Sequence, residues 1–201
     1  MSEFLAFVGL GFHHIVNPEA ADHILFLLAL AAIYRPRDWR DALWVVTAFT
    51  VGHSITLALA VTNALTLPTT WIEFLIPVTI VATGIENLLV RHRARASWRG
   101  RYRPVFSGVF GLVHGAGFAN YLKALFVERV AVPLFGFNVG IELGQLLVLV
   151  AAAIAFAGAD GGLERLRRPE SWPSALRLRV VGVSVVVILV AARWAVERRP
   201  W

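Results

Sequence analysis

Long apolar stretches, separated by short charged runs, dominate this sequence of 201 residues. A helix needs about 20 mostly apolar residues to cross the hydrocarbon core of a bilayer. Five stretches reach about this length, and a sixth is shorter but clearly apolar. They are Trp39–Thr62, Thr69–Val90, Pro104–Leu122, Ala131–Ala157 and Ala175–Val196, with Ala20–Tyr34 as the short one. The pattern predicts an all-α, polytopic transmembrane helix bundle of about six spans, in a single domain that covers residues 1–201.

The first residues of the chain form a separate apolar segment. Ser2–Asn17 is too short to span a bilayer, and Asn17-Pro18 interrupts it. We expect a short membrane-associated helix here that leads into the first span. Non-helical backbone at membrane depth is tolerated only where protein or water covers it. If His13 and His14 lie inside the membrane, this segment must therefore pack against the bundle.

The composition supports lipid as the solvent of this chain. Hydrophobic residues make up 58% of the sequence and charged residues only 16%, whereas soluble domains carry about 25% charged residues. The sequence contains no cysteine. Disulfides are therefore excluded, and so are the thiolate ligands that Cu(I) prefers.

Arginines gather in alternate connections between the predicted spans. The basic connections hold Arg35, Arg37 and Arg40, then Arg91, Arg93, Arg95, Arg99, Arg101 and Arg103, then Arg165, Arg167, Arg168, Arg177 and Arg179. This alternation predicts cytoplasmic basic loops and an outside N-terminus, in a multi-pass protein of a bacterial-type inner membrane. The alternate connections hold only Lys123 and Arg129, and the tail Arg198-Arg199 falls on the outer side, against this pattern. Basic loops that face anionic lipid explain the net charge of +6, and nucleic acid is not a predicted partner.

Ionisable and polar residues lie inside several predicted spans, where each charged group costs about 2.5–3.5 kcal/mol on insertion scales. Those with the chemistry of a site are Asp22, His23, His53, His114 and Glu142, with Asn138 and Gln145 at helical spacing from Glu142. Imidazole and carboxylate together suit Ni(II), Co(II), Zn(II) or Fe(II), and they also suit a proton relay. One buried histidine alone is usually a hydrogen-bonded packing residue. Four spans that each contribute a group favour a common site.

Other features of the spans have structural interpretations. Glu86 precedes Arg91 by about one turn and would pair with it, although a place near the site is also open for Glu86. The glycines Gly136, Gly140 and Gly144, and likewise Gly108, Gly111 and Gly115, form stripes of small residues for close helix packing. The longest hydrophilic connection, Gly158–Ser174, is predicted to be a flexible cytoplasmic loop.

Several blocks of this sequence together resemble the HupE/UreJ family of hydrogenase and urease accessory membrane proteins. The blocks are Gly11-Phe12-His13-His14-Ile15, Asp22-His23-Ile24-Leu25-Phe26-Leu27, Thr47-Ala48-Phe49-Thr50-Val51-Gly52-His53-Ser54, Phe110-Gly111-Leu112-Val113-His114-Gly115 and Gly136-Phe137-Asn138-Val139-Gly140-Ile141-Glu142-Leu143-Gly144-Gln145. The family is regarded as secondary permeases for nickel or cobalt, with a histidine followed by an Asp-His pair as its signature. The resemblance implicates His14, Asp22 and His23, and His53, His114 and Glu142 match the later blocks. Seven residues separate His14 from Asp22, which is longer than the compact signature associated with nickel uptake.

The resemblance and the residues together predict transport of a divalent transition-metal ion, nickel or cobalt before zinc. The ion would meet His14, Asp22 and His23 first and would then be held by His53, His114 and Glu142. The orienting partners would be Asn138, Gln145, Glu86 and Ser54. The expected partners are the metal ion and the lipid bilayer, and a homo-oligomer is compatible with the sequence.

Two other functions use the same ligands. Three ligands and an open position would let zinc activate water, as in an intramembrane metallohydrolase. A membrane subunit that metal stabilises, with neither transport nor catalysis, is the third alternative. We expect a transporter rather than an enzyme.

Overall fold

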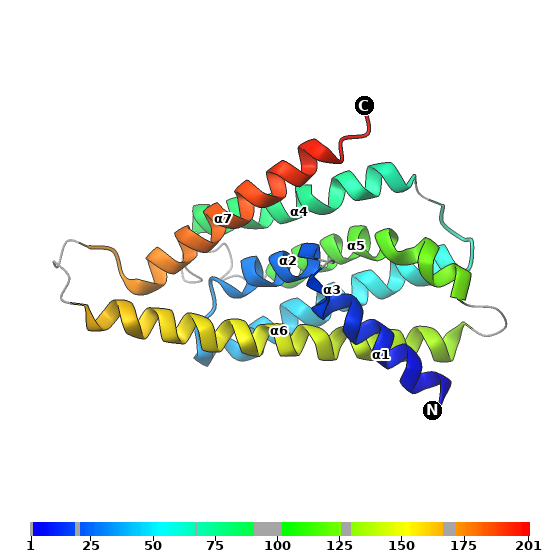
Figure 1. Cartoon of the computed structure of the whole chain (residues 1–201), viewed down its shortest axis with the longest axis horizontal. Helices are drawn as coiled ribbons and strands as arrows, with labels where there is room; N and C mark the ends of the chain where they lie inside the picture. The colour runs from blue at the N-terminus through cyan, green and yellow to red at the C-terminus, as the bar shows by residue number, and fades with distance from the viewer. Residues whose placement is uncertain (1, 19–20, 67, 91–101, 126–129, 167–171) are drawn as a thin grey trace.

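The computed structural model describes residues 2–18, 21–66, 68–90, 102–125, 130–166 and 172–201, without the side chains of residues 120 and 124. Within these residues the chain forms helices and no strands, which confirms the all-α prediction there (Figure 1). The elements are α1 (Glu3–Val16), α2 (Ala21–Ala31), the short 3-10 helix η2 (Pro36–Asp38), α3 (Trp39–Val61), α4 (Thr69–Val90), α5 (Arg103–Leu125), α6 (Ala131–Arg165) and α7 (Ala175–Glu197).

Four helical segments of the described residues are long and apolar enough to cross a membrane. They are Pro36–Val61, Thr69–Val90, Ala131–Arg165 and Ala175–Glu197, and each coincides with a predicted span. The fifth long helix, α5, is not among them and carries Arg103, His114 and Lys123. In place of the short predicted span Ala20–Tyr34 there is an apolar helix of 11 residues, α2. The count of six spans therefore stays a prediction.

The first two helices run in the same direction and are separated by a break. Ser2 begins α1 by accepting a hydrogen bond from the Leu5 amide at 3.4 Å. The helix ends at Val16, and Pro18 follows, which has no amide hydrogen to continue it. Figure 1 shows α1 running from the N-terminus to the middle of the molecule and α2 continuing toward the side where α3 begins. The end of α1 and the start of α2 therefore lie near the middle of the molecule along its long axis, and Pro18, after the end of α1, is exposed.

The longer helices pack mainly in three pairs: α1 with α6, α3 with α5, and α4 with α7. Glycines make the first two pairs very close. A Cβ atom on Gly140 would lie 2.0 Å from the Val8 carbonyl oxygen, and one on Gly52 would lie 2.0 Å from the Gly108 carbonyl oxygen. Such distances are possible only without side chains, so the predicted glycine stripes are confirmed as packing surfaces.

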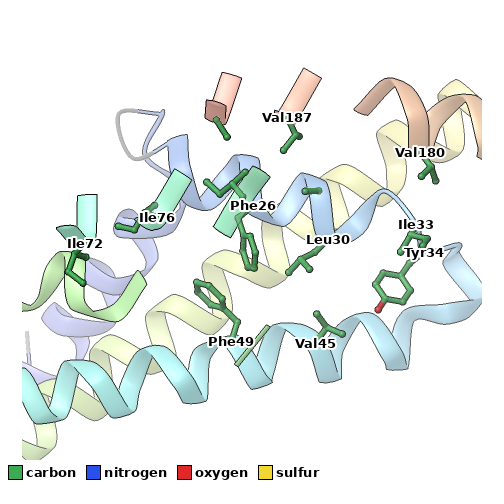
Figure 2. Packing of buried hydrophobic residues seen from close by; sticks show 13 residues of the cluster. Phe26, Leu30, Ile33, Tyr34, Val45, Phe49, Ile72, Ile76, Val180 and Val187 are labelled. Atoms are coloured by element: carbon green, nitrogen blue, oxygen red, sulfur yellow. The ribbon is translucent and has the colours of Figure 1, made fainter. Parts of the chain in front are cut away.

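The helix α2 lies between these pairs and contributes to the apolar core. In Figure 2 the rings of Phe26 on α2 and Phe49 on α3 face each other, and their centres are 4.9 Å apart. Leu30 of α2 and Val187 of α7 belong to the same cluster and are 2% and 1% exposed. The core thus holds the short helix α2 by contacts with several neighbouring helices.

The helix α6 extends beyond the prediction. Residues 158–165 are helical, whereas Gly158–Ser174 was predicted as a flexible loop; residues 167–171 lie outside the described part. Asp160 on this extension accepts a hydrogen bond from Arg179 of α7 at 2.7 Å. Arg179 also donates to the carbonyl oxygens of Ala32 and Tyr34. The loop prediction was wrong for residues 158–165, and the ion pair of Asp160 with Arg179 joins this segment to α7, the next helix in the chain.

Candidate metal site

Three histidines meet beside the break between α1 and α2. His14 lies in the last turn of α1, His23 in the first turn of α2, and His53 near the middle of α3. The end of α1 and the start of α2 lie close together, which brings His14 next to His23. Gly115 of α5 fixes the third, since a Cβ atom there would lie only 2.3 Å from the His53 carbonyl oxygen.

The three imidazoles are close enough to share one ion. One ring nitrogen from each of His14, His23 and His53 lies within 4.8 Å of the other two. The ring centres of His14 and His23 are 4.6 Å apart, and each is 6.1 Å from that of His53. Ligands bound to one ion at about 2.0–2.1 Å lie roughly 3–4 Å apart, so small side-chain movements would complete such a shell.

Two of the three histidines are buried, and most ring nitrogens of the cluster have no partner in the described part of the chain. His53 is 0% exposed and His23 is 7% exposed. Nε2 of His14 and both ring nitrogens of His23 and His53 are buried and have no hydrogen-bond partner among the described residues. The ring centres of Phe118 and His14 are 4.0 Å apart. Buried polar atoms are normally paired, so five unpaired nitrogens at one place make this cluster the candidate for a metal site.

His114 lies at the edge of this cluster. Its ring centre is 5.4 Å from that of His23, and it is 1% exposed. Its Nε2 lies 3.0 Å from the hydroxyl oxygen of Thr79 on α4. That hydroxyl is also 2.7 Å from the Ile76 carbonyl oxygen, to which it donates. With the hydroxyl hydrogen used there, Nε2 of His114 donates to Thr79. The other nitrogen, Nδ1, is buried without a partner and retains its lone pair.

The predicted carboxylate ligands have other partners. Asp22 accepts hydrogen bonds from Arg198 at 3.1 and 3.3 Å. Glu142 accepts hydrogen bonds from the hydroxyls of Thr47 at 2.7 Å and Thr50 at 2.6 Å. Among the described residues, neither carboxylate belongs to the group that shares the 4.8 Å distance.

The predicted orienting residues are distributed over two places. Gln145 and Ser54 both contact Thr50, which is a partner of Glu142. The side-chain amide oxygen of Gln145 is 2.8 Å from the Thr50 hydroxyl oxygen, and the Ser54 hydroxyl donates to the backbone carbonyl oxygen of Thr50 at 2.6 Å. Asn138 precedes Glu142 by one turn, and its Oδ1 is buried without a partner in the described part of the chain.

Glu86 belongs to a separate network at the end of α4. It accepts hydrogen bonds from Tyr102 and, at 2.7 Å, from Arg103. Arg103 is only 2% exposed and donates also to Asn87. Burial raises the pKa of Tyr102, and the hydrogen bond to Glu86 adds to the shift, so the phenol keeps its proton and donates. The expected partner Arg91 and the loop residue His92 lie outside the described residues.

The hydroxyl residues Thr47 and Thr50 were not predicted to have a role. Thr47 and Thr50 precede His53 at spacings of three residues, which places all three toward one side of α3. This spacing was a usable signal. Thr79 forms a polar row with Thr83 and Glu86 at helical spacing, but its contact with His114, 35 positions later in the sequence, appears only in the structure.

A pocket of about 290 Å³ lies elsewhere, between α3, α6 and α7. Its walls include Leu43, Leu149 and Phe156, with Arg35 and Arg179 also lining it. No imidazole or carboxylate of the described residues lines this pocket. It is therefore not a candidate for the metal site.

The comparisons with known proteins give one family. A scan of protein families matches residues 1–198 to the family described as HupE / UreJ protein. Searches of curated proteins and of solved structures found no significant match. The match covers nearly the whole chain, and the four apolar helices agree with a membrane protein. The chain belongs to the HupE/UreJ family.

Proposed function

We propose that this protein is a permease that moves a divalent transition-metal ion, nickel or cobalt, across the membrane through the histidine cluster. The observation that carries the proposal is a group of three imidazoles from three helices, of which His23 and His53 are buried and His14 is half-buried. Five of their ring nitrogens are buried without a partner among the described residues. Membership of the HupE/UreJ family supports nickel or cobalt as the substrate.

The ligand chemistry supports a site that binds and also releases the ion. Imidazole nitrogen is a good ligand for Ni(II) and Co(II). Three imidazoles leave coordination positions open on the ion. His114, beside the cluster, could supply Nδ1 as a further ligand. Conduction requires binding that is weak enough to allow release. Glu142, linked through Thr50 to the turn before His53, would offer the next carboxylate along the path.

We further propose six crossings of the membrane, with the broken unit α1–α2 as the first and α5 as the fourth. Irregular backbone at membrane depth must be covered by protein, and α1 packs along α6 while α2 lies in the core. Transporters use such interrupted helices to build ion sites. The N-terminus would then face outward in a bacterial-type inner membrane.

Cysteine labelling tests this orientation, because the chain has no cysteine of its own. Arg37 and Thr66 are exposed residues in successive connections. In intact cells, a membrane-impermeant maleimide should label Thr66→Cys and leave Arg37→Cys unlabelled until the cells are opened. If only Arg37→Cys is labelled in intact cells, the orientation is opposite to the one proposed.

The direct test of transport measures metal bound to purified protein and metal flux into liposomes. Wild-type protein should bind nickel and cobalt and show saturable uptake. His14→Ala should lose at least about tenfold in affinity, given that even groups that only orient ligands contribute about 10–100-fold. His13→Ala is the matched control: His13 adjoins His14 on α1, but its side chain is exposed.

The outcomes also separate the alternative functions. Tightly held zinc without any flux would favour an intramembrane zinc hydrolase, in which the open coordination position binds water. Bound metal with neither flux nor hydrolysis would leave a metal-stabilised membrane subunit. Uptake by His14→Ala equal to that of wild type would contradict the permease proposal.

A further inference from the structure

The segment after α7 folds back over the end of the bundle where α4 begins. The ring centre of Trp201 lies 5.4 Å from that of Phe74 and 6.1 Å from that of Trp71, both near the start of α4. Figure 1 shows the C-terminus on the same side of the molecule as these first turns. The aromatic contacts hold residues 198–201 close to the bundle.

This segment brings a positive charge to the carboxylate beside the histidine cluster. One nitrogen of the Arg198 guanidinium, Nη1, lies 3.1 and 3.3 Å from the two carboxylate oxygens of Asp22. Asp22 directly precedes His23, whose two nitrogens are unpaired. The guanidinium also lies over the ring of Trp194, at 5.3 Å from its centre. Arg198 therefore has a defined place, whereas the neighbouring Arg199 is exposed.

The environment of this pair makes it suited to exchange. The side chains of Arg198 and Asp22 are 33% and 20% exposed, so the pair is open to ions from outside the protein. Ion pairs that water reaches contribute little to stability. A divalent cation carries twice the charge of a guanidinium and binds the same carboxylate oxygens. It can therefore displace Arg198 at a small cost.

We propose that Arg198 is a tethered competitor of the metal: its guanidinium occupies Asp22 when no ion is bound, and an arriving divalent cation displaces it on the way to His14 and His23. This inference rests on the proposed metal site and adds a residue that sets the apparent affinity. It also gives a role to Arg198, one of the two tail arginines whose position disagrees with the charge pattern of the loops.

Equilibrium binding of nickel to purified full-length protein in detergent tests the competition without requiring transport. Arg198→Gln should lower the dissociation constant by about threefold to fivefold, which corresponds to release of a partly exposed ion pair. Arg198→Lys keeps a competing charge and should remain near wild type. Arg199→Gln, the matched control, should bind as wild type does.

A double variant identifies the group for which the ions compete. In an Asp22→Asn background, the change Arg198→Gln should have no further effect on nickel binding, because the contested carboxylate is gone. An additive gain in that background would show that Arg198 acts through general charge, and it would overturn the proposal. Equal binding by Arg198→Gln and wild type would overturn it as well.

Flux measurements on the same proteins separate this inference from the proposed function. If Arg198→Gln binds nickel more tightly but no protein supports uptake, the competition stands and the permease proposal fails. If wild type shows saturable uptake and Arg198→Gln matches it in binding and half-saturation, the permease stands and the competition fails. If no variant and no wild-type protein binds nickel, both fail.

Discussion

Replacement of His53 by alanine is expected to abolish saturable uptake of nickel and cobalt by reconstituted protein. His53 is fully buried and supplies one of the three imidazoles that share the 4.8 Å group. Loss of a group that only orients a ligand lowers metal affinity by about 10–100-fold. Loss of a direct ligand should therefore lower it by at least about 100-fold. Initial rates of uptake into proteoliposomes, measured over a range of metal concentrations, provide the test.

A second variant separates ligation from packing. His53→Gln keeps a polar side chain of similar length at this position and should preserve folding, but an amide is a poor replacement for an imidazole ligand. Both variants should therefore lose uptake, while His13→Ala keeps it. If His53→Gln transports metal like wild type, His53 is a packing residue and the cluster is not the path.

Addition of a single methyl group at the contact of α1 with α6 should also have a large effect. Gly140→Ala is expected to destabilise the protein by about 1–3 kcal/mol, the usual cost of overpacking. Its added methyl group would lie 2.0 Å from the Val8 carbonyl oxygen and 2.7 Å from the Phe12 amide nitrogen. The helix α1 would have to move away from α6, and His14 would move with it. Nickel affinity should therefore fall together with stability.

Gly158→Ala on the same helix is the matched control. No atom lies within 4 Å of the Cβ position of Gly158 among the described residues. Alanine favours helices over glycine by about 1 kcal/mol, so this variant should be neutral or slightly more stable. Unfolding in increasing SDS, followed by tryptophan fluorescence, measures both variants. A gain in stability for Gly140→Ala would contradict the close packing of α1 on α6.

Hydropathy predicted the long helices well, because their boundaries coincide with changes of composition. The predicted stretch Thr69–Val90 is the helix α4, and Trp39–Thr62 differs from α3 by one residue. The extension of α6 could not be predicted in this way. It depends on the ion pair between Asp160 and Arg179, which are on different helices.

The candidate site was predictable by residue type and only partly by geometry. Neighbouring residues on a helix point about 100° apart, so Asp22 and His23 need not serve the same site. His23 faces the other histidines, whereas Asp22 reaches Arg198, 176 positions later. The partners of Glu142, Thr47 and Thr50, are more than 90 positions away. Contacts between residues so far apart in the sequence cannot be predicted from the spacing of residues along one helix.

The division of the bundle into helix pairs has a mechanical consequence for the histidine cluster. His14 belongs to the pair of α1 and α6, His53 to the pair of α3 and α5, and His23 to the helix between them. An ion bound to all three histidines would link both helix pairs to α2. Metal binding would then restrict the motion of the two helix pairs relative to α2, because all three would be held together at the histidine cluster. This restriction would extend to the far ends of the helices.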